Sequence, residues 1–187
     1  MKIAFIDVLT SWNNVLNAAR NTIGKDESDN IPKSEWKRRI LLAEHSPIRS
    51  LIMRWKWIDI PYWVHVHLVR HKVGIEHFIT TSRTDRTGIK RDDLPQGSPV
   101  DHECIANAQS IINISRKRLC NMASKETREA WLIFIESFKN IEPELYYSCV
   151  PDCIYRSFCF EIKSCGFYKT KQYKEMLDTY HSGIRDE

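Results

Sequence analysis

The segment Leu68–Arg86 reads LVRHKVGIEHFITTSRTDR and is dense in cations and hydroxyl groups. The triplet Arg70–Lys72 closes a predicted amphipathic helix, and the run Thr-Thr-Ser-Arg-Thr-Asp-Arg follows it. Arg pairs with two phosphate oxygens at once and hydroxyls satisfy the remaining acceptors, so this composition fits a phosphate-bearing ligand. The four cations are Arg70, Lys72, Arg83 and Arg86. On charge alone, a solvated basic loop explains the segment equally well.

On the N-terminal side of this segment, the sequence predicts strands that alternate with helices. Residues Lys2–Val8 and Ser50–Asp59 are predicted strands because their apolar residues alternate. In the second strand Met53, Trp55 and Trp57 fall on one face, with Arg54 and Lys56 on the other. Helices are predicted over Asn14–Thr22, over Glu35–Glu44, and from Pro61 through Lys72.

On the C-terminal side, the predicted elements are mostly helical. Thr87–Pro99 is rich in Gly and Pro and is predicted to be a loop. Helices are predicted over Asp101–Met122, over Lys125–Lys139, and in a short piece that begins at Pro143. The tail from Cys149 is predicted to be irregular. Together these elements indicate one α+β domain, divided into residues 1–86, a loop 87–100, a helical half 101–148 and a cysteine-rich tail 149–187.

Length and composition are those of an ordinary globular domain. The chain has 187 residues, 42% hydrophobic and 28% charged, and a formal net charge of +4. This charge is too small to argue for nucleic acid by itself. No apolar run approaches the roughly 18 residues that a membrane span needs, and the first residues turn polar too early for a signal peptide. We expect a cytoplasmic protein, in a bacterium or a phage-infected cell.

Four of the six cysteines lie in the tail, at Cys149, Cys153, Cys159 and Cys165. Without a secretion signal, such thiols are expected to be reduced or to bind metal. Four thiols in so short a segment predict a tetrahedral zinc site, which would also help a segment with little apolar surface to fold. The alternative is a set of buried free cysteines that pack as small apolar groups.

Three short motifs together resemble those of the flavin-dependent thymidylate synthases. Arg70–Lys72, followed by seven residues and Thr80, resembles the family's RHR-x7-S signature. Asn17-Ala18-Ala19-Arg20 resembles its early Ala-Ala-Arg helix, and His45-Ser46-Pro47 resembles its His-x-[ST]-Pro turn. The order of these motifs matches over residues 2–86, close to half of the chain.

The resemblance implies a fold in which helices pack on a twisted, mostly antiparallel sheet, and a homotetramer that shares active sites between subunits. It implies FAD, a deoxyuridine monophosphate (dUMP) substrate, and methylenetetrahydrofolate and NADPH as co-substrates. The flavin would pass a hydride to the pyrimidine, while the protein positions the ligands and stabilises charge. The implied cofactor contacts are Arg70, His71, Lys72, His77 and His67. The implied catalytic residues are Thr80, Ser82 and Arg83, and the implied substrate contacts are Thr81, Arg83, Arg86 and Arg156.

Several positions depart from the family pattern. Lys72 replaces the second Arg of the signature and loses its two-pronged hydrogen bonding, and Thr80 replaces a Ser. Arg49-Ser50 stands where the family has Glu-His, and His67 where it has Gln. The family's later Arg-x4-Ala-Gln-x-Glu-Ile helix is absent. These departures indicate a compact, divergent phage-type branch, whose reaction is methylation, hydroxymethylation or another one-carbon transfer.

Two other classes of function remain open at this point. The first is a non-catalytic descendant that still binds nucleotide or flavin. The second is a zinc-stabilised nucleic-acid-binding module built on the cysteine tail and the basic run Arg116–Arg118. If the protein is not such a module, this basic run is a solvated helix face or a phosphate-binding group. His67 and His71 also have the four-residue spacing of a zinc pair, but the neighbouring cations oppose a metal there.

Overall fold

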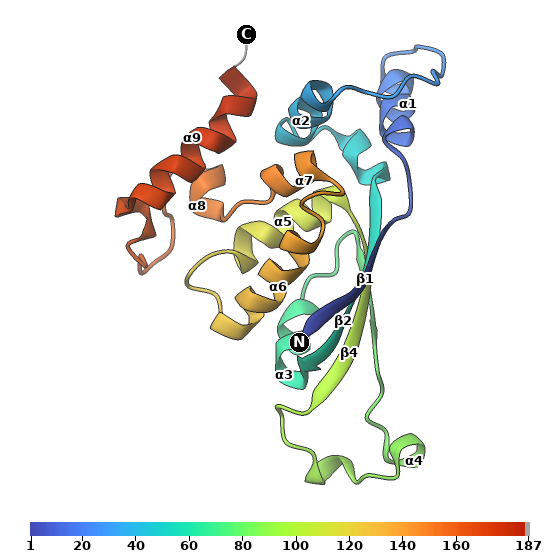
Figure 1. The fold of residues 1–187 in the computed structure, drawn as a ribbon, viewed down its shortest axis with the longest axis vertical. Coiled ribbons are helices and arrows are strands. Elements are labelled where there is room, and N and C mark those ends of the chain that lie inside the picture. Colours follow the sequence, from blue (N-terminus) through green and yellow to red (C-terminus); the bar gives the residue numbers. More distant parts are fainter. Residues whose placement is uncertain (186–187) are drawn as a thin grey trace.

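The computed structural model describes residues 1–185, with side chains through Ser182, and its centre is a four-stranded antiparallel sheet in the order β1-β2-β4-β3. The strands are β1 (Lys2–Val8), β2 (Ile52–Pro61), β3 (Ile75–Ile79) and β4 (Pro99–Asn107). Helices cover one face of this sheet, and the helices furthest from it belong to the C-terminal end (Figure 1). The expected α+β domain with a mostly antiparallel sheet is therefore confirmed.

The helices divide into groups by their place around the sheet (Figure 1). Those against its face are α3 (Tyr62–Leu68), α5 (Ala108–Arg118) and α6 (Lys125–Ser137). Those around one end of the sheet are α1 (Trp12–Thr22), α2 (Ser34–Leu42) and α7 (Pro143–Ser148), together with the 3-10 turn η1 (Ser46–Ser50). The outer helices are α8 (Asp152–Tyr155) and α9 (Lys171–Arg185), joined by a segment with the turn η3 (Phe167–Lys169). A loop carries α4 (Thr84–Thr87) and η2 (Arg91–Asp93) away from the helices.

The core forms where the aromatic face of β2 meets α6. Trp55 stacks on Phe134 with ring centroids 3.9 Å apart, and Trp57 Nε1 donates to the Ala130 carbonyl at 2.9 Å. Trp131 Nε1 donates to Ser115 Oγ on α5 at 2.9 Å, so both of these buried indole N–H groups have partners. Replacing a fully buried aromatic such as Trp57 with Ala would cost about 3–5 kcal/mol.

The opposite face of the sheet carries charged and aromatic side chains and no covering helix among residues 1–185 (Figure 1). Arg54 pairs with Glu103 at 2.7 Å, and Lys56 pairs with Asp101 at 2.7 Å. Phe78, on the edge strand β3, is 54% exposed on this side. A half-buried sheet face of this kind is available for contact with another chain.

Around the centre of the chain, two predicted helices are longer than the observed ones and one strand was not predicted. The predicted helix Asp101–Met122 is a strand up to Asn107 and a helix only over α5. Strand β3 was not predicted, and the helix expected to run through Lys72 ends at Leu68. Alternation explains the strand: Val100, His102, Cys104 and Ala106 are buried, while the residues between them are half-buried.

The tail is more regular than predicted, because residues 171–185 form the helix α9. Its inner face carries Tyr173, Met176, Leu177 and Tyr180, which pack with Val150 and Ile154 as a second, small core. This three-four spacing is a helical signal that was present in the sequence. In the part of the chain described here, no helix is both long and apolar enough to cross a membrane.

Candidate functional site

The Arg-His-Lys triplet lies in the turn between α3 and β3. Helix α3 ends at Leu68, and the His71 amide donates to the Leu68 carbonyl at 3.1 Å as the chain leaves the helix. Gly74 then takes a positive φ of +70°, a conformation that residues with a Cβ adopt only with strain. The Asn107 amide N–H donates to the Gly74 carbonyl at 3.0 Å, and the turn is thereby joined to the start of α5.

Arg118, the last residue of α5, holds this turn from the side. Its Nε donates to His71 Nε2 at 2.9 Å, and its second guanidinium nitrogen donates to the His67 carbonyl at 2.7 Å. Since Arg is always a donor, His71 Nε2 must be an unprotonated acceptor. Burial, followed by the nearby Arg118, lowers the pKa of His71 to about 4. His71 is therefore neutral at pH 7, with its proton on Nδ1.

The surface beside His71 is positively charged and lacks local neutralisation. Arg70 and Lys72 are exposed, and neither forms an ion pair with any residue in the range 1–185. Burial and the charge of Arg70 together lower the pKa of Arg118, which means that two guanidinium groups repel one another here. Bringing an anion such as a phosphate to this point would relieve that repulsion.

Behind the turn, His77, His102 and Cys104 form a mutually contacting triad. The register of the sheet creates it, because β3 pairs His77 with Cys104 and Ile79 with His102 across β4. His77 Nε2 donates to the His71 carbonyl at 2.8 Å, so its Nδ1 is free to accept from His102 Nε2 at 2.9 Å. Burial lowers the pKa of His102 to about 3, which keeps that ring neutral.

The triad contains metal-binding side chains, but its spacing is that of hydrogen bonds. Cys104 Sγ lies 3.3 Å from both His77 Nδ1 and His102 Nε2, and the three atoms are close enough to share an ion. A tetrahedral zinc would hold the two nitrogens about 3.4 Å apart and each nitrogen about 3.6 Å from the sulfur. The observed contacts instead fix the His71 carbonyl, and through it the Arg-His-Lys turn.

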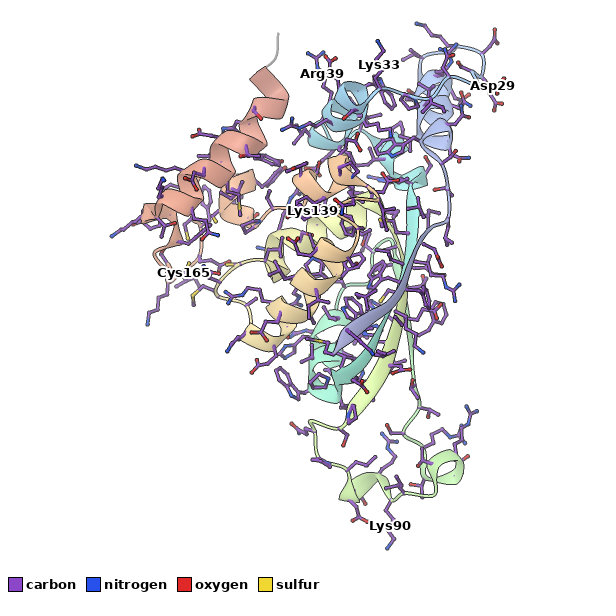
Figure 2. The ribbon with its side chains drawn as sticks, viewed as in Figure 1. Asp29, Lys33, Arg39, Lys90, Lys139 and Cys165 are labelled. Atoms are coloured by element: carbon purple, nitrogen blue, oxygen red, sulfur yellow. The ribbon has the colours of Figure 1, made fainter. Side chains whose placement is uncertain are left out.

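The hydroxyl-rich segment lies at the other end of β3. The Thr80 amide donates to the Asp101 carbonyl at 2.9 Å, and Thr81 Oγ1 accepts from the Arg83 amide at 3.3 Å. Arg83 is paired with Asp85 through two hydrogen bonds of 2.9 and 2.6 Å, while Ser82 is half-buried and Arg86 is exposed. Five strand residues at about 3.3 Å each separate this segment from the turn by roughly 16 Å. Figure 2 shows Lys90, further along the same loop, at the far end of the molecule from α2.

The other predicted binding residues have partners within the fold. His67 Nδ1 contacts Thr127 Oγ1 at 3.0 Å. Arg156, which follows α8, stacks on Phe160 with its guanidinium carbon 3.6 Å from the ring centroid. It also lies 3.5 Å from Asp152, in a part of the molecule separate from α3 (Figure 1). The structure thus brings Arg70, His71, Lys72 and His77 together, and it places Arg156 elsewhere.

Three residues of the site were not assigned to it from the sequence. Arg118 was one of three cations considered for a phosphate grip, and only its contacts distinguish it from Arg116, which binds Glu44 and stacks on Tyr155. His102 and Cys104 fell within the predicted helix, so their partnership with His77 was not visible. Correct assignment of β4 would have placed all three triad members on adjacent strands.

Solved structures with this arrangement of helices and strands are known. The flavin-dependent thymidylate synthase ThyX from Helicobacter pylori, complexed with FAD and dUMP, has a TM-score of 0.66 and 16% identity, covering 80% of this chain and 100% of that one. A second ThyX structure from the same organism, with FAD and dUMP, has a TM-score of 0.63 and 14% identity, covering 80% of this chain and 97% of that one.

A third structure, the UMP/dUMP methylase PolB from Streptomyces cacaoi bound with 5-Br dUMP, has a TM-score of 0.60 and 13% identity, covering 82% of this chain and 95% of that one. No family model and no curated protein sequence matches the chain. At these identities the likeness concerns the fold, and it agrees with the resemblance carried by the Arg-His-Lys signature. The chain therefore has the fold of the flavin-dependent thymidylate synthases.

Proposed function

We propose that this protein is a flavin-dependent enzyme that transfers a one-carbon unit to C5 of dUMP or a related pyrimidine nucleotide. The observation that carries the proposal is the turn after α3, where Arg118 fixes His71 beside the unpaired cations Arg70 and Lys72. The fold supports it, since two structures with this fold hold FAD and dUMP, and a third holds a dUMP analogue.

Arg70 and Lys72 would bind the diphosphate of FAD. Their side chains are exposed and lack ion-pair partners among the residues described, so the anion would replace only water. When bound, FAD supplies the hydride for reduction of the one-carbon adduct, with NADPH and methylenetetrahydrofolate as co-substrates. Neutral His71 accepts from Arg118 through Nε2 and has its Nδ1–H left to donate to a ligand acceptor.

Thr80, Thr81, Ser82, Arg83 and Arg86 would bind the nucleotide phosphate and sugar of a site completed by a second copy of the chain. The segment Thr80–Arg86 begins roughly 16 Å along β3 from the turn that would bind the FAD diphosphate. A homotetramer with shared sites would bring this segment of one chain to the flavin turn of another, and the half-buried sheet face with Phe78 offers a surface for the contact.

The direct test is flavin retention and turnover by the purified protein. Arg70→Ala should lose bound flavin, as judged from the visible absorbance of the protein, whereas Lys174→Ala, which removes one exposed cation on α9, should keep it. Reduced flavin in the wild-type protein should be oxidised when dUMP and methylenetetrahydrofolate are both present, and mass spectrometry of the nucleotide identifies the carbon unit. Equal flavin content in the two variants would contradict the placement of the site.

A non-catalytic nucleotide-binding descendant is the second candidate, because Arg83 is already neutralised by Asp85. Asp85→Asn would free the guanidinium and should tighten dUMP binding several-fold if Arg83 binds phosphate. Asp92→Asn, an equal charge change on η2, is the matched control. Nucleotide binding without any flavin oxidation in wild type and in Asp85→Asn would favour the non-catalytic candidate.

A further inference from the structure

The segment 155–174, which joins α8 to the first turn of α9, carries the charge excess of the whole chain. Its charged residues are five cations and one carboxylate, an excess of +4 that equals the formal net charge of the protein. The cations are Arg156, Lys163, Lys169, Lys171 and Lys174, and the carboxylate is Glu161. Figure 1 shows this segment on the far side of α5 and α6 from the sheet, and Figure 2 shows Cys165, near its middle, at that outer surface.

Most of these cations lack ion-pair partners. Lys163, Lys169 and Lys174 are exposed, and none of them forms an ion pair with a residue in the range 1–185. Lys171 lies 3.3 Å from Glu175, but its side chain is still 91% exposed. Exposed pairs of this kind contribute little. Phosphate groups would therefore meet cations that are neutralised only weakly by the protein itself.

Aromatic side chains are exposed between these cations. Phe158, Phe160 and Tyr168 are 59%, 56% and 39% exposed. The rings of Phe158 and Phe160 contact each other edge to face, with centroids 5.1 Å apart, and the guanidinium carbon of Arg156 lies 3.6 Å from the Phe160 centroid. A surface that holds exposed rings next to cations fits a partner that has both flat rings and anionic groups.

The tail cysteines do not account for this surface. They were predicted to bind zinc, but among the residues described only His77, His102 and Cys104 bring three metal-binding atoms within 4.8 Å of one another. Between α8 and α9 the one regular element is the turn η3. The exposed side chains of the segment thus belong neither to a core nor, within the described chain, to such a metal site.

The two ends of the segment come together at a cavity of about 590 Å³, which Phe160 and Tyr168 both border. Tyr146 and Tyr147 of α7 border it as well. Its volume lies within the range of ligand pockets, about 300–1,000 Å³, so an unstacked base has room to enter between the rings. Most charged side chains in its lining are carboxylates, which suit the amino groups of a base and keep phosphates outside, on the lysines: Glu136, Asp152, Glu161 and Glu175.

We propose that this surface binds single-stranded DNA. Bases would stack on Phe158, Phe160 and Tyr168, and the phosphates would contact the lysines of the segment, as in proteins that bind single strands without reading their sequence. A duplex keeps its bases stacked inside and would meet only the lysines. The surface lies apart from the α3 turn, so the proposal is independent of the flavin site.

The hydroxyl groups of the segment favour DNA over RNA. Its serine and threonine side chains are already hydrogen-bonded within the fold. Ser157 Oγ contacts His181 Nε2, Ser164 Oγ accepts from the Gly166 amide, and Thr170 Oγ1 donates to a backbone carbonyl. None of them is arranged to recognise the 2′-hydroxyl, the group by which proteins distinguish RNA.

An anionic membrane is the other partner that a basic surface with exposed rings can fit, and two features disfavour it. A helix that lies on a membrane inserts its apolar face, but the apolar face of α9 packs against Val150 and Ile154. Glu161 lies between Phe160 and Ile162 in the sequence, so inserting these two side chains would bring a carboxylate into the membrane interface. Stacking of bases requires no such insertion.

Fluorescence anisotropy of a labelled oligothymidylate of about 20 nucleotides, with the full-length protein at about 50 mM salt, tests the proposal. We expect binding that weakens as salt is added, weaker binding to a duplex of the same length, and no tighter binding to oligouridylate. Lys163→Gln/Lys169→Gln/Lys174→Gln should weaken binding at least tenfold and reduce the slope of log K against log salt by about 2. The control with equal charge loss, Lys2→Gln/Lys25→Gln/Lys33→Gln, changes exposed residues elsewhere and should keep both values.

A second variant separates stacking from general hydrophobic contact. Phe158→Leu/Phe160→Leu removes two exposed rings and keeps apolar side chains, so the fold should stay intact by far-UV circular dichroism. Its affinity for the oligothymidylate should fall about tenfold or more. All of these variants should retain flavin, and binding of the oligonucleotide by a protein without flavin would support this inference alone.

Four results would overturn the proposal. They are absence of oligothymidylate binding by the wild-type protein, equal affinities of the two lysine variants, full affinity of the Phe158→Leu/Phe160→Leu variant, and tighter binding to the duplex than to the single strand. Vesicles that contain one-third phosphatidylserine provide the membrane comparison. Binding to these vesicles without binding to the oligonucleotide would assign the surface to a membrane instead.

Discussion

Arg118 Nε lies 2.9 Å from Nε2 of His71, and this hydrogen bond ties the last residue of α5 to the turn after α3. The same guanidinium donates to the His67 carbonyl at 2.7 Å, near the end of α3, where helix carbonyls lack intrahelical partners. One side chain thus sets the orientation of His71 and closes the C-terminus of α3. It acts on the proposed cofactor through His71, as a positioning residue.

Arg118→Gln should therefore weaken flavin binding at least tenfold and lower the free energy of unfolding by about 1–3 kcal/mol. Arg118→Lys keeps the charge and loses the second hydrogen bond, so it should restore stability only in part. Lys117→Gln, an exposed neighbour on the same helix, is the matched control. Flavin titration and urea unfolding give the two readouts, and unchanged flavin affinity in Arg118→Gln would contradict a positioning role.

Gly74 is the second residue on which the turn depends. Its φ of +70° disfavours any side chain, and an added Cβ would lie 2.5 Å from Asn107 Nδ2. Asn107 caps α5 by accepting from the Ser110 amide at 2.9 Å, so the clash would also disturb that cap. Gly74→Ala should lower the free energy of unfolding by about 2–4 kcal/mol, from backbone strain and the weakened cap together.

Gly97→Ala provides the matched control for this change. Gly97 has no positive φ and no heavy atom within 4 Å of an added Cβ, so its substitution should be neutral or slightly stabilising through the unfolded chain. Urea unfolding midpoints of the two variants check the difference. Similar midpoints would mean that Asn107 moves aside and that the turn is less constrained than its geometry indicates.

The neutral histidines predict a loss of stability in mild acid. Burial lowers the folded pKa of His102 to about 3 and that of His71 to about 4, below the value near 6.5 in the unfolded chain. Below pH 6.5 the unfolded state therefore binds more protons, and the free energy of unfolding falls as the pH falls toward these folded pKa values. At pH 5 each of these two histidines should lower the free energy of unfolding by about 2 kcal/mol relative to pH 7.

Urea unfolding of wild type and of His102→Gln at pH 7 and pH 5 measures how much stability His102 costs as the pH falls. The variant is expected to be less stable at pH 7 but to lose about 2 kcal/mol less between the two pH values. His45→Gln, which replaces an exposed imidazole, is the control. If His102→Gln and wild type lost the same free energy of unfolding between pH 7 and pH 5, the assignment of His102 as a buried neutral histidine would be wrong.

The local sequence pattern was sufficient to predict part of the fold. The strict alternation of Met53, Trp55 and Trp57 with Arg54 and Lys56 predicts β2 and its buried face, because burying both sets together would bury charge. Strand β4 was not recognisable in this way. Its inner positions include His102 and Cys104, whose burial depends on His77 and Trp57 from other strands.

The candidate site was likewise only partly predictable from the sequence. The signature Arg70–Lys72 is contiguous and could be found from the sequence, whereas its support is not. His77 and Cys104 are 27 positions apart, and Arg118 and His71 are 47 apart, and both pairs meet only through sheet register and helix packing.

The proposed sharing of the site between subunits can be tested by mixing two inactive variants. Arg70 and Arg83 lie beyond opposite ends of β3, and in the proposed arrangement each shared site would take one of them from each of two chains. Arg70→Ala and Arg83→Ala should each be inactive alone. In oligomers assembled from an equal mixture, about one site in four would receive both wild-type residues, and activity should return to roughly that fraction.

A mixture of Arg70→Ala with Arg70→Lys/Arg83→Ala, in which no site carries Arg at both positions, is the control. Recovery of dUMP-dependent flavin oxidation only in the first mixture supports the shared site. If activity does not return after subunit exchange has been verified, Arg70 and Arg83 of the same chain belong to one site.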